Sequence, residues 1–391
     1  MSAPLLRSLT RPRVVPIIRR RFSSAEISEL AGYSLSDPEC NVPANVAAKV
    51  GRNLHNQRLH PLHTIQSKIQ EYWGSDFVVH NDLSPIVPTQ QNFDQLGFPA
   101  DHVSRGRSDT YYLNNETVLR THTSAHQIDL LRTGLQRFLV VGDVYRRDEI
   151  DRSHYPVFHQ TEGVQVFDQA VLASLSEKAQ TDLIVTDLKQ KLEGLATHLF
   201  GEREMRWLDE YFPFTHPSFE LEIHFQDEWM EVLGCGVIHP NILRNAGRPD
   251  DKGWAFGLGL ERLAMILFGI PDIRLFWTDD ERFHSQFASG EIIQFQPYSK
   301  YPACYKDISF WIHNENFHAN DLNELVRDVA GDLVEEMELI DNFTHPKTNK
   351  TSHCYRISYR CMDRSLTNEE IDRLQEEVRR KAESELGVEL R

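Results

Sequence analysis

The C-terminal quarter of the chain carries the pattern that most restricts its fold. Between residues 321 and 338, apolar side chains recur at i, i+3, i+4 and i+7, the period of one helix face, and Asp321 with Glu324 forms an approximate helix cap. Thr367 and Glu370 form a capping box, which predicts the start of a second helix. Strands are predicted around these helices at 304–312, 338–344, 353–361 and 387–391. The order βαββαβ predicts a four-stranded sheet with two helices, the ferredoxin-like arrangement.

The residues ahead of this unit follow a different pattern. Apolar periodicity predicts helices at 54–73 and 172–200, and a run of β-favouring residues predicts a buried strand at 137–146. Alternating apolar and polar residues predict strand structure at 219–233, and the segment 254–272 is expected to be a strand, a glycine-bearing turn and a helix. Antiparallel-looking strands with interspersed helices, without regular βα alternation, indicate the α+β class.

The change of pattern divides the chain. A length of 391 residues suggests two or three domains. We expect a larger domain at 23–287, a linker at 288–298 and the small βαββαβ domain at 299–391. No run approaches the ~18 consecutive apolar residues of a membrane span, so we expect no membrane partner. The five cysteines are scattered and contain no Cys-x-x-Cys pair, which indicates free thiols in a reducing compartment.

The N-terminus differs from the rest of the chain in charge. Residues 1–25 contain six arginines and no acidic residue, whereas the whole chain has a net charge of −16. An Arg-rich, acid-free and Ser-containing N-terminus is typical of a mitochondrial transit peptide, which we place at 1–22, and it predicts a location in the mitochondrial matrix. The alternative is a basic tail that contacts nucleic acid. Because the remaining chain is strongly acidic, a nucleic-acid partner requires local basic patches.

Two local sequences suit a nucleotide site. The sequence from Tyr145 to Asp148 contains two arginines at the end of a predicted strand, and an aromatic residue, Phe158, follows with Gln160 and Glu162. An arginine there can bind a phosphate, and an aromatic ring can stack on a purine. Taken alone, however, the sequence Arg146-Arg147-Asp148 is usually a solvated turn. The second sequence, GLGLER from Gly257, places glycines at a strand-to-helix turn. Ordinary close packing explains such glycines equally well, and the sequence is neither a dinucleotide fingerprint nor a P-loop.

A third sequence contains two histidines four residues apart. His122 and His126 flank Ser124, and this spacing on a helix can bind zinc. No further histidine or carboxylate stands at a recognisable spacing, so no zinc is predicted. A hydrogen-bonding cluster for a polar ligand is the preferred interpretation.

These three sequences together resemble the class II aminoacyl-tRNA synthetases. Residues 145–162 look like motif 2 and 257–262 like motif 3 of that class. Within the class, the chain is similar to phenylalanine–tRNA ligases of the single-chain mitochondrial kind, and the tail resembles their anticodon-binding domain. The sequences that carry this resemblance are NFDQLGFP, LRTHTSAHQ, YPVFHQTEG, YFPFTHPSFE, GWAFGLGLERL, SKYPACYKDISFW and HPKTNKTSHCYRISYR. Motif 1, the usual dimer-forming element of that class, is only faintly visible near His60. This agrees with a monomeric protein.

The resemblance implies a role for each matching residue. Arg146 and Arg262 would be the catalytic residues, and Glu231 would be a magnesium ligand. The ATP site would comprise Arg146, Ser153, His154, Tyr155, Phe158, Glu231, Gly257, Gly259 and Arg262. The phenylalanine site would comprise His122, Ser124, Ala125, His126, Gln127, Gln160, Thr161, Glu162, Phe212, Phe214, Thr215, Ala255 and Phe256. The resemblance also implies activation of phenylalanine with ATP and Mg²⁺ and its transfer to the 3′-terminal adenosine of mitochondrial tRNA(Phe), for mitochondrial translation.

The chemistry of this reaction fits the residues present. The attacking carboxylate is already ionised at neutral pH, so the site must supply positioning and positive charge rather than a strong base. The tail is acidic apart from a group of basic residues that would contact tRNA: Lys347, Lys350, Arg356, Arg360 and Arg364. The alternative is that these residues form an ordinary solvated hairpin. Other interpretations are a non-catalytic tRNA-binding paralogue and a catalytic subunit that needs a partner chain. Without an editing module, we expect only modest discrimination against tyrosine.

Overall fold

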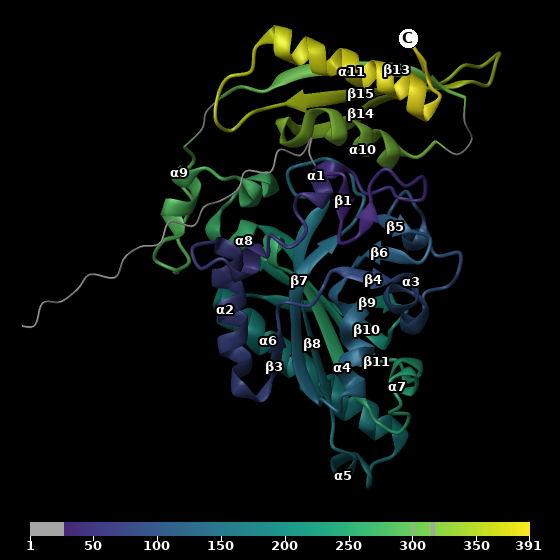
Figure 1. Ribbon diagram of the computed structural model, residues 1–391. Coiled ribbons are helices and arrows are strands. Elements are labelled where there is room, and N and C mark those ends of the chain that lie inside the picture. Colours follow the sequence, from purple (N-terminus) through teal and green to yellow (C-terminus); the bar gives the residue numbers. More distant parts are fainter. Residues whose placement is uncertain (1–26, 299–300, 314–316) are drawn as a thin grey trace, which may run out of the picture.

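The chain folds around two main sheets, one of seven strands and one of four (Figure 1). The computed structural model describes residues 27–298, 301–313 and 317–391, so the predicted transit peptide at 1–22 lies outside the described residues. Seven strands form the larger sheet, in the spatial order β3 (Val78–His80), β7 (Arg137–Tyr145), β8 (Val157–Val166), β12 (Gly253–Gly259), β11 (Glu228–Ile238), β10 (Thr215–Phe225) and β9 (Met205–Phe212). All neighbours are antiparallel except β3 and β7. The predicted α+β class is confirmed.

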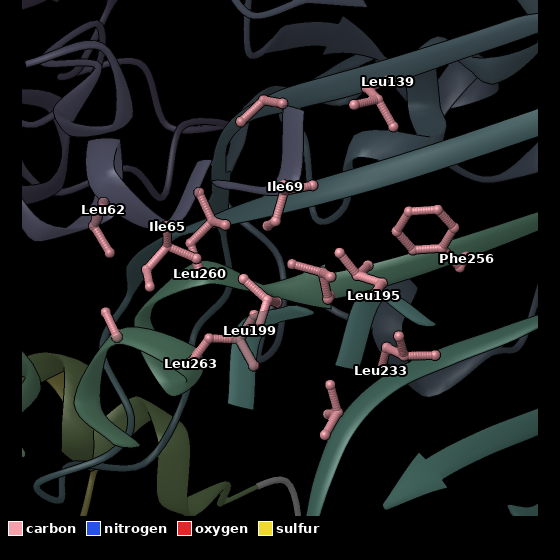
Figure 2. Close-up of a cluster of buried hydrophobic side chains, with 14 of the residues drawn as sticks. Leu62, Ile65, Ile69, Leu139, Leu195, Leu199, Leu233, Phe256, Leu260 and Leu263 are labelled. Atoms are coloured by element: carbon pink, nitrogen blue, oxygen red, sulfur yellow. The ribbon is translucent and has the colours of Figure 1, made fainter. Parts of the chain in front are cut away.

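One face of the seven-stranded sheet is covered by three helices, α2 (Pro61–Trp73), α6 (Glu177–Phe200) and α8 (Leu260–Phe268). Their apolar sides bury a core against alternate residues of the strands, among them Leu139, Leu233 and Phe256 (Figure 2). Side chains in a strand alternate between the two faces, so the residues between these core positions face the other side. That other side carries the functional cavity described below.

Smaller elements cover the second face. A second core joins the sheet to α4 (Gln127–Arg132) and α7 (Pro240–Asn245). Nearby lie α3 (Thr89–Asn92) and a three-stranded sheet of β4 (Ile86–Pro88), β6 (Thr117–Leu119) and β5 (Tyr112–Asn114). The remaining short elements are β1 (Glu29–Leu30), β2 (Tyr33–Ser34), α1 (Ala44–Ala47), α5 (Gln169–Leu172) and α9 (Glu281–His284). No helix among the described residues has the length and apolar character needed to span a bilayer.

Several predicted elements of this domain have different bounds in the structure. The helix predicted from residue 54 begins at Pro61, because proline suits the first turn of a helix and not its interior, and a short 3₁₀ turn precedes it. The strand predicted over 219–233 is two strands, β10 and β11, joined at Gln226 and Asp227, both of which have positive φ. Ser176 caps α6 through a hydrogen bond from the amide of Ala179.

The C-terminal domain has the predicted βαββαβ order. Its elements are β13 (Cys304–Ile312), α10 (Ala319–Ala330), β14 (Val334–Thr344), β15 (Thr351–Tyr359), α11 (Asn368–Leu386) and β16 (Glu389–Leu390), with the spatial strand order β14-β15-β13-β16. Thr367 caps α11 as predicted, accepting a hydrogen bond from the amide of Glu370 at 3.2 Å. The predicted extension of the first helix to residue 338 is wrong. Gly331, with a φ of 55°, ends α10, so Val334 and Met337 belong to β14.

The two domains are in direct contact. Helix α10 lies on the side of the small domain that faces the larger one (Figure 1). The residue that caps the start of this helix is His318, and not Asp321 as predicted. Residues 288–298, expected to be a linker, contain no helix or strand, and Phe295 within them is buried and donates its amide to the carbonyl of Phe268 at 2.7 Å. This segment therefore packs on the larger domain.

Candidate active site

A cavity of about 520 Å³ opens above the second face of the seven-stranded sheet. Strand β8 contributes alternate residues to it, so Gln160 and Glu162 line the cavity while Thr161 between them does not. Strand β12 contributes the consecutive residues Ala255, Phe256 and Gly257, although Phe256 also belongs to the core on the helix side. Twelve of the residues predicted for the site line it: Arg146, Glu231, Gly257, His122, Ser124, Gln160, Glu162, Phe212, Phe214, Thr215, Ala255 and Phe256. The structure thus brings together residues from widely separated parts of the chain.

Ten predicted site residues lie outside the described lining of this cavity: Ser153, His154, Tyr155, Phe158, Gly259, Arg262, Ala125, His126, Gln127 and Thr161. The Tyr155 hydroxyl donates to a carboxylate oxygen of Asp332, in the small domain, at 2.5 Å. The His154 ring pairs with Asp151 at 2.6 Å, and His126 contacts the guanidinium of Arg120 at 2.9 Å.

Two more of the residues predicted for ATP, Phe158 and Arg262, border the cavity. Phe158 lies beneath the guanidinium of Arg146, whose central carbon is 5.1 Å from the ring centroid. Arg262 makes an ion pair with Glu231, which itself lines the cavity. Both therefore stand next to cavity residues without lining it.

Aromatic rings form one end of the cavity. Phe98 stacks on His122 at 5.6 Å, and Phe212 stacks on Phe214 at 6.0 Å, while Phe98 and Phe214 are 6.1 Å apart. Gly234 in β11 makes room for this arrangement, since an added Cβ would lie 2.7 Å from the Phe212 ring. Such a ladder of rings suits a flat apolar ligand group.

A buried carboxyl group stands beside the aromatic end. Burial raises the pKa of Glu162 to about 8, and the nearby polar groups of Ser124 and Thr123 act in the opposite direction. Burial, together with the positive charge of Arg146, lowers the pKa of His122 to about 3, so this ring is neutral. A buried carboxylate becomes stable when a cation is placed against it, so this end of the cavity suits a ligand with an ammonium group.

The part of the cavity wall around Arg146 is suited to an anion. Arg146 is held by a hydrogen bond from its Nε to the carbonyl of Thr121 at 2.9 Å. An added Cβ at Gly257 or Gly259 would meet no protein atom within 4 Å, and neither glycine has positive φ. These glycines therefore leave open space above the strand and are not required by packing or turn geometry.

Buried polar groups fix the segments that carry the site. Arg120 binds Asp143 through its guanidinium at 3.0 Å, and the carbonyl of Arg120 accepts the amide of Tyr145 at 2.9 Å. The carboxylate of Glu261 accepts both the amide and the ring nitrogen of His159, each at 2.7 Å. The first pair joins the segment before His122 to β7, and the second joins α8 to β8.

Sequence reasoning missed other residues of the cavity. Phe98 stood within a sequence that carried the resemblance, and Arg147 and Asp148 stood within the candidate nucleotide sequence from Tyr145 to Asp148, but none of the three was given a role of its own. The remaining missed residues are His102, Ser104, Asp109, Thr110, Thr121, Thr123, Tyr211, Pro213, Gly234, Cys235 and Asn320. Asn320 comes from the small domain, and no local sequence signal announces such a contact.

The five basic residues predicted to contact tRNA are not equally available. Arg356 makes two hydrogen bonds of 2.9 Å to Asp307, and Arg364 pairs with Glu370. Arg360 pairs with the buried carboxylate of Glu335 at 3.1 Å. Lys347 and Lys350 lie between β14 and β15, and Lys350 is 3.7 Å from Glu389.

Comparisons with known proteins agree with this architecture. Residues 43–287 match the tRNA synthetases class II core domain (F), and residues 299–391 match the ferredoxin-fold anticodon binding domain. The chain therefore belongs to the class II tRNA synthetases, which use ATP to join an amino acid to tRNA.

Similar proteins indicate to which family within that class the chain belongs. The chain is 54% identical to the chloroplastic/mitochondrial phenylalanine–tRNA ligase of Arabidopsis thaliana, over 95% of this chain and 90% of that protein. It is 51% identical to the mitochondrial phenylalanine–tRNA ligase of Mus musculus, over 93% and 88%, and 39% identical to that of Saccharomyces cerevisiae, over 91% and 93%. The chain belongs to the mitochondrial phenylalanine–tRNA ligases.

Proposed function

We propose that the cavity binds phenylalanine at its aromatic end and ATP at its Arg146 end, and joins them as phenylalanyl-adenylate. The observation that carries this assignment is that the buried carboxyl of Glu162 lines one cavity together with an aromatic ladder and an arginine. Glu162 and Gln160 would bind the α-ammonium group, and Phe212 and Phe214 would contact the phenyl ring. The carboxylate of the substrate would then point toward Arg146.

The reaction needs no general base. The carboxylate oxygen of phenylalanine attacks the α-phosphorus of ATP, and pyrophosphate leaves with the electron pair of the broken P–O bond. Arg146 stabilises the charge that develops on the phosphate, because a hydrogen bond fixes it in place before the reaction. The adenine ring takes the space above Gly257 and Gly259, with Phe158 and Arg262 as its stacking partners.

We propose Mg²⁺ as the metal that accompanies ATP. Its preferred ligands are oxygens of carboxylates and phosphates, and Glu231 presents a half-exposed carboxylate to the cavity. The pKa of nearby Glu220 is raised by burial and by the negative charge of Glu231, so this region of negative charge fits a divalent cation. When bound, Mg²⁺ would neutralise phosphate charge. In the structure Arg262 is paired with Glu231. If this carboxylate bound Mg²⁺ instead, Arg262 would become available to the nucleotide.

The small domain presents a face for the tRNA anticodon. Trp311 and Phe343 lie on the sheet face opposite the apolar core, with ring centroids 6.4 Å apart, and Phe343 is 41% exposed. The guanidinium of Arg391 lies 5.0 Å from the Trp311 ring. Exposed rings on a sheet, next to cations, suit unstacked RNA bases. We propose this face and the neighbouring Lys347 and Lys350 as the tRNA contact, in a monomeric enzyme of the mitochondrial matrix.

The assignment of Arg146 is tested by phenylalanine-dependent ATP–pyrophosphate exchange. Loss of a fixed positive charge at the phosphate predicts that Arg146→Ala lowers kcat by about 100-fold or more, with Arg146→Lys intermediate. An Arg391→Ala variant serves as the control, since Arg391 lies in the small domain against Trp311. Near-normal exchange in Arg146→Ala contradicts the proposed orientation of the substrates.

A further inference from the structure

The loop that follows Arg146 is bonded to the small domain along most of its length. This loop, residues 146–156, joins β7 to β8 and carries Arg147 and Asp148 into the cavity wall. The guanidinium of Arg327, in α10, donates to the carbonyls of Asp148 and Glu149 at 2.9 and 3.2 Å. The amide of Met337, in β14, donates to the carbonyl of Ile150 at 2.9 Å.

The contact is buried as well as polar. The Ile150 side chain belongs to the apolar core of the small domain and is 6% exposed, although the residue lies in the larger domain's loop. Glu324 and Arg327 are each more than nine-tenths buried, and their side chains bond at 3.1 Å. Glu324 also accepts a hydrogen bond of 2.6 Å from Tyr111 in the larger domain. A peripheral docking contact would not require two charged side chains to leave water.

The start of α10 reaches the cavity itself. Asn320 lines it, and its side-chain amide donates to the carbonyls of Arg147 and Ser108 at 3.2 and 3.3 Å. The neighbouring Asp321 binds the guanidinium of Arg147 at 3.0 Å. The loop residue closest in sequence to Arg146 is therefore fixed by two consecutive residues of the other domain.

We infer that the nucleotide end of the cleft is built by both domains: the small domain supplies Asn320 to its wall, and Glu324 and Arg327 act as positioning residues for the loop after Arg146. This inference rests on the proposed nucleotide site. The phenylalanine end is formed by β8, β12 and the segments around Phe212 and His122, so a change in the loop acts on ATP binding far more than on phenylalanine binding.

The test is the ATP–pyrophosphate exchange of the full-length chain carrying Glu324→Gln or Asn320→Asp. Glu324→Gln keeps the side-chain size and removes the charge that holds Arg327 and Arg147. The inference predicts that the KM for ATP rises about tenfold in each variant, while the KM for phenylalanine changes less than about twofold. A partial recovery in Glu324→Asp is expected, because that variant restores the charge.

The control is Asp328→Asn, which removes an ion pair of 2.9 Å to Lys381 within the small domain. Its KM for ATP should equal that of the wild type even if its thermal stability falls. The inference is overturned by active variants whose KM for ATP is unchanged, or by variants in which the KM values for ATP and phenylalanine rise equally. Absence of exchange in the wild-type protein would instead refute the proposed function.

Discussion

At the scale of single residues, the proposed amino-acid site depends on Glu162. Its buried carboxyl has a pKa of about 8, so it is mostly protonated at neutral pH in the empty cleft. The ammonium group of phenylalanine stabilises the carboxylate, so binding releases a proton. Affinity then improves as pH rises toward 8, because less work is needed to ionise the group.

The pH dependence follows from that shift. Between pH 6 and pH 8 the KM for phenylalanine should fall by close to tenfold per pH unit and level off above pH 8, as the cited pKa requires. Exchange rates at a series of pH values measure this, and calorimetry in two buffers measures the released proton. Glu162→Gln, with a high and pH-independent KM, is the control. A wild-type KM that is flat over this range would show that Glu162 does not bind the ammonium group.

Two glycines give a second residue-scale prediction. Gly234→Ala places a methyl group 2.7 Å from the Phe212 ring, so the KM for phenylalanine should rise while the KM for ATP stays near normal. Gly257→Ala meets no protein atom within 4 Å, so it should leave the melting temperature unchanged and raise the KM for ATP. Steady-state exchange kinetics and thermal melting measure both. Destabilisation by Gly257→Ala would indicate that this glycine is required for packing.

At the scale of elements, sequence patterns predicted the helices and strands whose end residues are set by neighbouring residues in the chain. The cap at Thr367 and the strand over 137–146 depend on neighbouring residues, and both appear where expected. The end of α10 was not predicted. Apolar residues continue with helical spacing past Gly331, because Val334 and Met337 face the same core from strand β14. The residues predicted to bind phenylalanine and ATP were assigned through sequence similarity, whereas the place of Asn320 in the cavity wall depends on a contact between distant segments.

The cap of α11 has a measurable energy. Thr367→Ala removes the oxygen that accepts the Glu370 amide, which should lower the free energy of unfolding by about 1 kcal/mol. Thr367→Ser keeps that oxygen and should be nearly neutral. Urea denaturation of the full chain, followed by a probe in the small domain, measures the difference. Equal stability of the alanine and threonine proteins would mean that the cap contributes nothing to α11.

At the scale of the whole molecule, the activation site and the proposed tRNA face lie in different domains. Lys347→Ala combined with Lys350→Ala should weaken tRNA binding and reduce its salt dependence, because fewer phosphates are neutralised. Pyrophosphate exchange should be unchanged, because neither lysine lines the cavity. Filter binding at several salt concentrations and exchange on the same samples measure both. Wild-type tRNA affinity in the double variant would remove this loop from the interface.

The two domains are nevertheless joined through the loop after Arg146, so they are separable in sequence but not in the proposed nucleotide site. The measurement that tests the central claim most directly is ATP–pyrophosphate exchange with each of the twenty amino acids in turn. The account predicts a strong signal with phenylalanine, a weak one with tyrosine, and none above background with the others. A silent, folded protein in the presence of Mg²⁺, or a stronger signal with another amino acid, would contradict it.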